Sequence, residues 1–148
     1  MAKELVKKST DELLKELENT EEFRRYAEEN RDQFSGEPLS RVLSDLLQEK
    51  GLTKTEVFRR AEISEDYGYQ IFSGLRAPGR GKLLSLAVAM GLSFAETQGL
   101  LKRAGLAPLY AKNEFDCVVI YGIFHQKTVV EINEMLFDTL QKTLGDEK

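Results

Sequence analysis

Apolar residues recur at helical spacing along most of the chain, and glycines or short polar stretches separate one repeat from the next. Between residues 39 and 107 these breaks come often enough to define five short helices. The first runs from Leu39 to Lys50 and ends at Gly51. The fourth runs from Arg80 to Met90 and ends at Gly91. The pattern therefore predicts an all-α segment of short helices joined by tight turns.

Polar residues that can cap helix N-termini mark where the other three helices begin. Thr53 and Ser93 are each followed three residues later by a glutamate, which is the capping-box spacing. Ser64 is a favourable N-cap for a helix that reaches about Ser73. Only a tight turn at residues 62–63 separates this helix from the one that Thr53 opens. Two short helices joined in this way within a five-helix core form a helix-turn-helix, whose second helix commonly lies in the DNA major groove.

The segment before this domain, residues 1–38, predicts a helical hairpin. One helix follows Thr10, and Thr20 is the expected N-cap of a second helix that extends to Phe34. The apolar residues of each helix fall on one face, and the charged residues between them indicate a solvated opposite face. The sequence Ser-Gly-Glu-Pro, which ends at Pro38, separates the hairpin from the domain.

The segment after the domain, residues 108–148, predicts two strongly apolar helices. Asn113 is the expected cap of the first, which includes the only stretch with strand character, residues 118–121. Thr128 opens the second with a third capping box, and its apolar face extends to Leu144. Such apolar helices need a partner surface. Either they pack on the domain or they form the interface of a homodimer, and the pattern leaves both arrangements open.

The order and spacing of residues within 39–107 agree with those of a known protein family. Ten residues separate Ser64 from Gly74, as is usual in that family. The matching residues are Thr53-Lys54, Ile63-Ser64, Ile71, Gly74, Pro78 and the run LLSLAVAMGLS. On these residues the segment resembles the lambda Cro/CI (Xre-type) family of helix-turn-helix transcription regulators. The resemblance implies a Cro/CI-like five-helix domain, here with an N-terminal helical hairpin and two C-terminal helices.

The resemblance also implies a surface that faces DNA. In the family the second helix begins against phosphate, which assigns Thr53 and Lys54 to that role. The third helix presents its outer side to the bases, where Gln70 can pair bidentately with adenine. The loop after it touches the DNA backbone. The candidate DNA-binding residues are Thr53, Lys54, Ser64, Glu65, Asp66, Tyr69, Gln70, Arg76 and Arg80.

Four neighbouring side chains are expected to have structural roles. Tyr67 and Phe72 lie on the same helix as the candidate DNA-reading residues, and we expect both to pack. Arg59 and Arg60 near the end of the second helix are expected on a solvated face. None of the four is therefore included in the predicted site.

The chain departs from the family pattern in four respects, of which the first two form one pair. Phe58 and Gly68 exchange the usual small and large residues of the helix pair, so Phe58 is expected to fill the space that Gly68 leaves. Glu62 stands where glycine is common, and because a left-handed conformation is costly there, the turn is expected to differ in detail. Glu65 and Asp66 favour the helix dipole but repel a polyanion, unless they accept hydrogen bonds from cytosine N4.

The net charge of −4 is unevenly distributed along the chain. Residues 1–38 contain seven Lys or Arg against eleven Asp or Glu, a net −4, and residues 108–148 contain four against seven, a net −3. Residues 39–107 contain ten against seven, a net +3. The positive excess thus coincides with the predicted DNA-binding domain, where local Lys and Arg placement governs phosphate neutralisation.

The candidates for enzymatic chemistry are few. His125 and Cys117 are each the only residue of their type and lie eight positions apart on one predicted helix. This separation is a rise of roughly 12 Å at ~1.5 Å per residue, too far for a hydrogen bond. Cys117 is expected in the core and His125 at a helix end. We therefore expect no enzyme, no cofactor and no metal site.

The sequence as a whole predicts a protein that binds duplex DNA specifically and regulates transcription, as a homodimer. It has no internal disulfide partner for its single cysteine and no apolar run of 18 residues, so we expect a cytoplasmic protein without contact to a membrane. The alternative is a protein-interaction module that keeps the helix-turn-helix scaffold, has lost DNA binding, and engages a protein partner through the flanking helices. A more remote alternative is a small-molecule sensor with a pocket at the apolar C-terminal helices.

Overall fold

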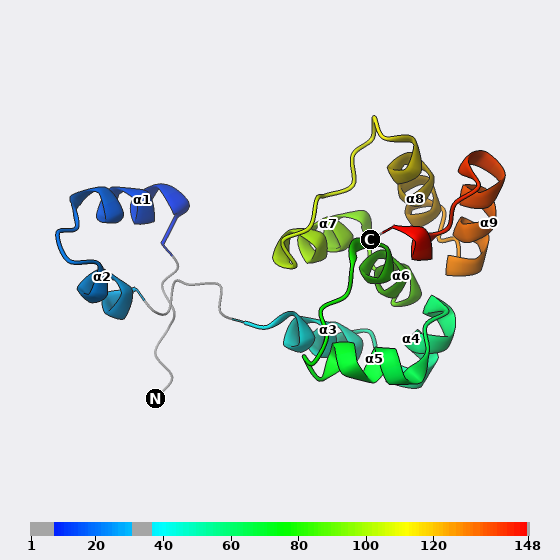
Figure 1. The fold of residues 1–148 in the computed structure, drawn as a ribbon, viewed down its shortest axis with the longest axis horizontal. Helices are drawn as coiled ribbons and strands as arrows, with labels where there is room; N and C mark the ends of the chain where they lie inside the picture. The colour runs from blue at the N-terminus through cyan, green and yellow to red at the C-terminus, as the bar shows by residue number, and fades with distance from the viewer. Residues whose placement is uncertain (1–7, 31–36, 148) are drawn as a thin grey trace. The chain divides into compact units, whose positions relative to one another are not determined.

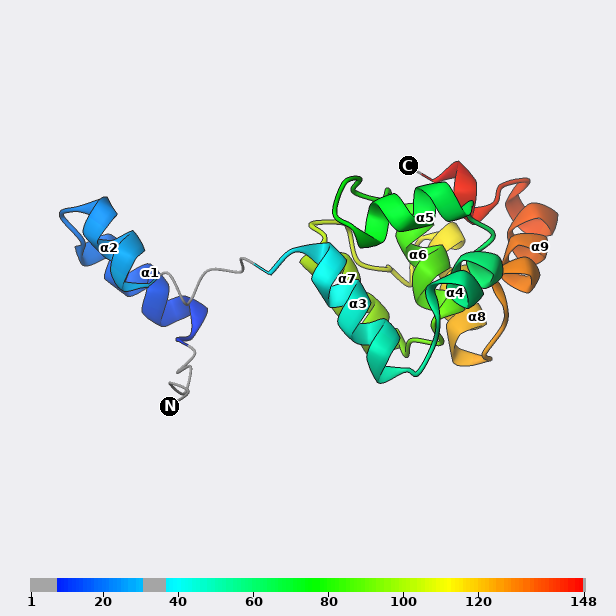
Figure 2. The ribbon, with the colours of Figure 1, turned by 90° about the horizontal axis from the view of Figure 1, so that it is seen from below.

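The computed structural model describes residues 8–30 and 37–147, which form α-helices, turns and one short 3₁₀ helix, with no strand among them (Figures 1 and 2). The predicted all-α fold class is confirmed for this part of the chain. Contacts between residues divide the chain into two compact units, Met1–Glu37 and Pro38–Lys148.

The described residues of the N-terminal unit form two helices, α1 (Thr10–Asn19) and α2 (Phe23–Glu29). Ser9 caps α1, because its hydroxyl accepts a hydrogen bond from the backbone N–H of Glu12 at 3.1 Å. Tyr26 of α2 is buried and its ring stacks on that of Phe23, with 6.1 Å between the centroids.

The prediction that Thr20 opens the second helix is wrong. Thr20 instead ends α1, and its hydroxyl donates a hydrogen bond to the carbonyl of Glu16 in the preceding turn. Helix α2 begins three residues later, at Phe23. The last part of the predicted helix, up to Phe34, lies outside the described residues.

The five helices predicted for residues 39–107 are all present. They are α3 (Leu39–Glu49), α4 (Lys54–Ala61), α5 (Glu65–Phe72), α6 (Arg80–Ala89) and α7 (Phe94–Arg103). Ser64 caps α5, and Ser93 with Glu96 forms a complete capping box on α7. At Thr53 only half of the predicted box forms: the hydroxyl accepts from the N–H of Glu56, whose carboxylate lies 4.0 Å from Arg60.

Helix α6 is the centre of the larger unit, and the other helices surround it (Figures 1 and 2). It contacts α4, α7, α9 and the 3₁₀ helix η2 (Leu144–Asp146). Leu83, Leu84 and Leu86 are completely buried, so α6 carries apolar side chains on several sides, as a core helix does. The hydroxyl of Ser85, also buried, donates to the carbonyl of Gly81 at 3.0 Å and is thus satisfied.

The C-terminal helices α8 (Glu114–Phe124) and α9 (Val129–Leu140) pack on the domain formed by α3–α7. Val119, Ile132 and Leu136 have no exposed surface and share one hydrophobic core with that domain. Asn113 caps α8, and Thr128 caps α9 with a complete capping box, as predicted. Packing on the domain, one of the two arrangements that the pattern left open, is therefore present.

The predicted continuation of the last helix to Leu144 is wrong. Helix α9 ends at Leu140, because Gln141 adopts a left-handed conformation with φ +56°. The chain then turns, and η2 inserts Leu144 into the core from another direction, where it is fully buried. A Cβ atom on Gly81 would collide with the carbonyl oxygen of Leu144, so only glycine permits this close contact between α6 and η2.

The expected burial of Cys117 is also wrong, since this side chain is exposed. Helix α8 carries apolar residues on more sides than its neighbours can cover, which leaves Cys117, Tyr121 and Phe124 at the surface. The expectation for His125 is confirmed: it is the C-cap of α8, and its ring lies 4.2 Å from that of Tyr121 between centroids.

The prediction that Phe58 of α4 fills the space at Gly68 of α5 is confirmed. Phe58 is 1% exposed, and a Cβ atom on Gly68 would lie within 2.6 Å of three ring carbons of Phe58. The aromatic ring therefore occupies the volume that a side chain at Gly68 would need. The turn between these helices keeps a left-handed residue despite the absence of glycine, because Glu62 has φ +57°, so the expectation of a different turn is wrong.

Candidate nucleic-acid interface

Helices α4 and α5 lie at the outside of the larger unit (Figure 2). Ile71 and Phe72 of α5 are buried in the hydrophobic core, so the expected packing of Phe72 is confirmed. Glu65, Asp66 and Tyr69 are exposed on the opposite side. This amphipathic arrangement presents one polar side of α5 to solvent.

The starts of both helices are open to solvent. Thr53 and Ser64 are exposed, and the hydroxyl of each accepts a hydrogen bond from a backbone N–H at 3.3 Å. Lys54, the first residue of α4, is exposed beside Thr53. Helix starts that combine free N–H groups, hydroxyls and a cation are suited to a phosphate group.

Three cationic side chains lie against aromatic rings of α5. The Nζ atom of Lys54 is 5.8 Å from the ring centroid of Phe72. The Cζ atom of Arg76 is 5.5 Å, and the Nζ atom of Lys82 is 6.0 Å, from the ring centroid of Tyr67. These distances are within the range of cation–π attraction, about 6 Å. Tyr67 is also packed against the core, as expected.

Lys82 was not predicted from the sequence, which instead indicated Arg80 as a cation that follows α5. The two residues are two positions apart on α6, and a helix turns by about 100° per residue, so their side chains leave α6 in very different directions. The spacing of Lys82 from Arg80 was the signal that could have shown that only one of the two side chains lies beside α5. We call one surface the α4–α5 face; it consists of Thr53, Lys54, Ser64, Glu65, Asp66, Tyr67, Tyr69, Gln70, Arg76 and Lys82.

Gln70 and Arg76 are held together on this face. The Nε atom of Arg76 donates to the side-chain oxygen of Gln70 at 2.9 Å, and the backbone N–H of Arg76 donates to the carbonyl of Gln70 at 3.1 Å. Gln70 is half-buried and Arg76 is exposed. The pair therefore offers the amide N–H₂ group of Gln70 and the remaining guanidinium N–H groups as donors.

Glu65 and Asp66 are the negative groups of the α4–α5 face. They occupy the first turn of α5, where the helix dipole favours negative charge, and both are exposed. Neither forms an ion pair within the described part of the chain. Their charge therefore acts directly on any ligand that approaches α5.

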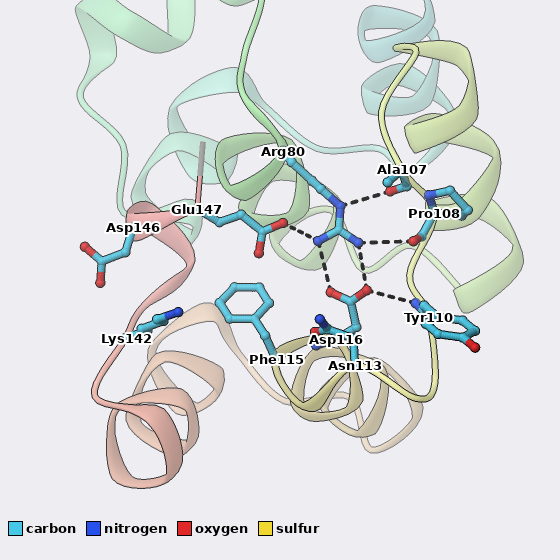
Figure 3. Close-up of a pocket in the computed structure, with 10 residues that line it drawn as sticks. All are labelled: Arg80, Ala107, Pro108, Tyr110, Asn113, Phe115, Asp116, Lys142, Asp146 and Glu147. Carbon is cyan, nitrogen blue, oxygen red and sulfur yellow. Dashed lines mark hydrogen bonds and ion pairs between the residues drawn. The ribbon is translucent and has the colours of Figure 1, made fainter.

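Arg80 requires a correction to the predicted site, because its guanidinium points towards Asp116, Glu147 and the loop at Ala107 (Figure 3). Its side chain is buried, and its Nε and Nη2 atoms donate to the carbonyls of Ala107 at 2.9 Å and Pro108 at 3.2 Å. The guanidinium also forms a bidentate pair with Asp116, at 2.9 and 3.0 Å, and an ion pair with Glu147. All five of its N–H groups are used, so none remains for a DNA phosphate.

The cluster around Arg80 connects the start of α6 to three later segments. Asp116 of α8 also accepts a hydrogen bond from the backbone N–H of Tyr110 at 2.9 Å, which ties the loop after α7 to the same group (Figure 3). Burial alone would lower the pKa of Arg80, but its hydrogen bonds to Asp116 and Glu147 outweigh burial and raise this pKa. The guanidinium therefore remains charged, and it joins α6, the α7–α8 loop, α8 and η2.

Comparison of the chain with models of protein families, with curated proteins and with solved structures finds no match. None of the described helices is long and apolar enough to cross a membrane. Across the described residues, no group of three or more His, Cys, Asp and Glu side chains is arranged to hold a metal ion.

Proposed function

We propose that this chain binds duplex DNA through the α4–α5 face and regulates transcription. The observation that supports the proposal is that cations lie on both flanks of α5. Lys54 lies beside Phe72 on one flank, and Arg76 and Lys82 lie beside Tyr67 on the other. The major groove is about 12 Å wide and has a phosphate strand on each side, so a helix within it needs cations on both flanks.

The positions of these aromatic residues along α5 explain the two flanks. At about 100° per residue, Glu65, Asp66 and Tyr69 fall on one exposed arc of the helix, which Tyr67 bounds on one side and Phe72 on the other. The exposed arc is the part of α5 that would face the bases. The cations at its edges would then contact phosphate and position the helix, without reading sequence.

The amide of Gln70 is the best candidate for reading a base. In the free protein its oxygen accepts from Arg76 at 2.9 Å. Transfer of the Arg76 guanidinium to a phosphate would free this oxygen, and the amide could then pair with adenine through one donor and one acceptor. DNA binding is therefore expected to break the contact between Gln70 and Arg76.

The proposal is tested by the salt dependence of duplex binding. Three phosphates neutralised by Lys54, Arg76 and Lys82 predict a log–log slope of about −2.7 per protomer, at ~0.9 per phosphate. Replacing any one of these residues by glutamine should make the slope less steep by about 0.9. The measurement is a fluorescence-anisotropy titration with a duplex selected from a random pool, repeated over a series of salt concentrations.

Lys112→Gln is the matched control, because Lys112 is an exposed lysine outside the α4–α5 face. This variant should keep the wild-type slope. The proposal fails if no duplex binds even at about 50 mM salt, the low end of the usual range. It also fails if Lys112→Gln and the three variants of the α4–α5 face change the slope equally.

Base reading is tested separately with Gln70→Ala. This change should relax the preference at one base pair and cost about 1–3 kcal/mol there, while the salt slope stays unchanged. Arg80→Ala should not specifically remove a phosphate contact, since Arg80 is buried in its own cluster. A variant of Gln70 that weakens all sequences equally would show that Gln70 positions α5 rather than reads a base.

A protein-interaction module is the second candidate function, and the exposed pair Glu65 and Asp66 is the observation that favours it. The double change Glu65→Gln and Asp66→Asn distinguishes the two functions. If these acids only repel phosphate, the change tightens nonspecific DNA binding; if they accept from cytosine, it weakens the specific complex. If neither the wild type nor the double variant binds DNA, the interaction module becomes the preferred function.

A further inference from the structure

A second basic surface lies away from the α4–α5 face, where a cavity of about 550 Å³ opens between the α3–α4 turn, α4, the end of α6 and the α8–α9 turn. Its apolar lining comes from Leu52, Val88, Ala89, Met90, Val129 and Val130. We call this cavity the basic pocket, because four of its other lining residues are Lys50, Arg59, Arg60 and Lys127. Among its described lining residues none is acidic.

Three of the four cations of the basic pocket have a glutamate nearby, and Arg59 has none in the described residues. Arg60 and Lys127 each lie about one helical turn from a glutamate, at 4.0 and 3.9 Å, and these exposed pairs are weak. Lys50 has the closest partner, the carboxylate of Glu96 at 3.1 Å. Arg59 is exposed and forms no ion pair in the described residues. The pocket therefore keeps a positive potential that an anionic ligand would reduce.

A smaller cavity of about 210 Å³ continues the basic pocket towards α8. The two cavities share Val88, Gly91, Gln126 and Lys127 in their walls. The smaller one reaches Leu92 and Ile123, which are apolar. The two cavities are therefore adjacent, with Lys127 in the walls of both and Arg59 in the wall of the larger one only.

We propose that the basic pocket binds a small amphiphilic anion, with a medium-length aliphatic chain and one carboxylate head group. The chain would lie along Val88 and Ile123, and the carboxylate would bind the guanidinium of Arg59 and the ammonium of Lys127. The volume is in the range of small-molecule sites, about 300–1,000 Å³, whose apolar walls supply affinity and whose few polar groups fix orientation. Charge complementarity disfavours a neutral head group, and it disfavours a cationic one still more.

This inference does not depend on DNA binding. The basic pocket uses the C-terminal end of α4 and the α8–α9 turn, whereas the α4–α5 face uses the N-terminal end of α4. None of the residues that line the pocket belongs to that face. A ligand measurement can therefore fail while DNA binding succeeds, and the reverse.

The test uses the full chain and sodium decanoate below the concentration at which it forms micelles. Isothermal titration calorimetry should give one site, with decanoate bound at least about ten-fold more tightly than decanol, since one charge-assisted contact contributes roughly 1.5 kcal/mol. Decyltrimethylammonium should bind more weakly than both. The variant Arg59→Gln with Lys127→Gln should lose at least about ten-fold in affinity for decanoate and leave decanol unchanged.

Two further proteins make the result specific. Lys112→Gln removes a lysine that lines neither cavity and should bind decanoate as the wild type does. Val130→Trp introduces the only tryptophan of the chain at a rim position that is 48% exposed, so its emission should change when decanoate binds. Equal affinity for the three amphiphiles, equal losses in Lys112→Gln and the double variant, an unchanged emission, or no binding would each overturn the proposal.

Discussion

The contact between Phe58 and Gly68 allows the packing of α4 on α5 to be tested by two substitutions and their combination. Phe58→Ala removes the ring, Gly68→Ile adds a side chain at the same place, and the double variant exchanges the large and small residues. If the two positions share one volume, the single changes should both destabilise the protein. The double change should then recover much of the loss, because the new isoleucine occupies the space that the ring has left.

The magnitude of the Phe58→Ala effect follows from the surroundings of the ring. Loss of a fully buried phenylalanine side chain costs about 3–5 kcal/mol. The ring also makes edge contacts with Tyr69 and Phe72, at 5.2 and 5.6 Å between centroids, each worth about 0.5–1.5 kcal/mol. Gly68 has no side chain that could move into the cavity. We therefore expect a loss of about 4–5 kcal/mol, at the upper end of the range.

Gly68→Ile should cost at least about 1–3 kcal/mol, since its Cβ alone meets three ring carbons of Phe58 within 2.6 Å. The coupling between the two changes should be about 2 kcal/mol, within the range for residues in contact. Gly99→Ala is the control, because Gly99 also lies within a helix but a Cβ there meets no atom within 4 Å. It should stabilise the chain by about 1 kcal/mol through helix propensity.

Urea denaturation followed by circular dichroism measures the four proteins of the cycle and the Gly99→Ala control, with the slope of the transition as a check on the unfolded state. The expected result is a strongly non-additive cycle between Phe58→Ala and Gly68→Ile. Additive losses, with coupling below about 0.5 kcal/mol, would show that the residues do not share a volume. A Gly68→Ala variant as stable as Gly99→Ala would refute the close contact itself.

Three further predictions concern other parts of the molecule. Asp116→Ala should reduce the free energy of unfolding, measured by urea denaturation, by about 3 kcal/mol. This is the lower end for a broken buried ion pair, because Glu147 remains beside Arg80. The control Asp138→Ala, at an exposed residue, should change the free energy of unfolding by less than about 0.5 kcal/mol. Hydrogen bonds from the backbone N–H groups of Ser93 and Thr128 lower the pKa values of Glu96 and Glu131. The stabilisation from these two carboxylates is therefore present above their unfolded-state pKa and is lost as the pH falls through their lower folded-state pKa. The variant with both Glu96→Gln and Glu131→Gln should show a smaller decrease in Tm than the wild type over that acidic range. Phe124 is 63% exposed beside Phe94, and we expect it to contribute to a homodimer that Phe124→Glu dissociates, as light scattering after size-exclusion chromatography would show; a wild-type monomer would contradict this expectation.

Local signals predicted most of the helices of the larger unit correctly. The caps at Ser64, Ser93 and Thr128 depend on a hydroxyl and the backbone within three residues, which the sequence displays directly. The contact between Phe58 and Gly68 was also predicted, because the resemblance implied that these two positions face each other. A hydroxyl near a helix end is ambiguous, however, and Thr20 donates to a preceding carbonyl instead of accepting from a following N–H.

The errors concern features that depend on distant residues. The role of Arg80 is decided by Asp116 and Glu147, which lie 36 and 67 positions further along the chain, and no local spacing indicates such partners. Leu144 has the sequence spacing of the apolar residues of α9, but it belongs to η2 and reaches the same core from there. The spacing alone therefore predicted too long a helix. Helix α8 is apolar on more sides than the neighbouring helices cover, and Cys117 lies on an uncovered side. The apolar composition of this helix alone therefore overestimates the burial of Cys117.

The cluster at Arg80 has a consequence for how the chain folds during its synthesis. Arg80 begins α6, the central helix, but Glu147 is made 67 residues later, after all of α7, α8 and α9. Until Asp116 and Glu147 are both available, burial of the guanidinium would leave an incompletely paired charge, which is strongly unfavourable. We therefore expect the nascent chain to keep the start of α6 hydrated, and the larger unit to close in one late cooperative step rather than helix by helix as it is translated.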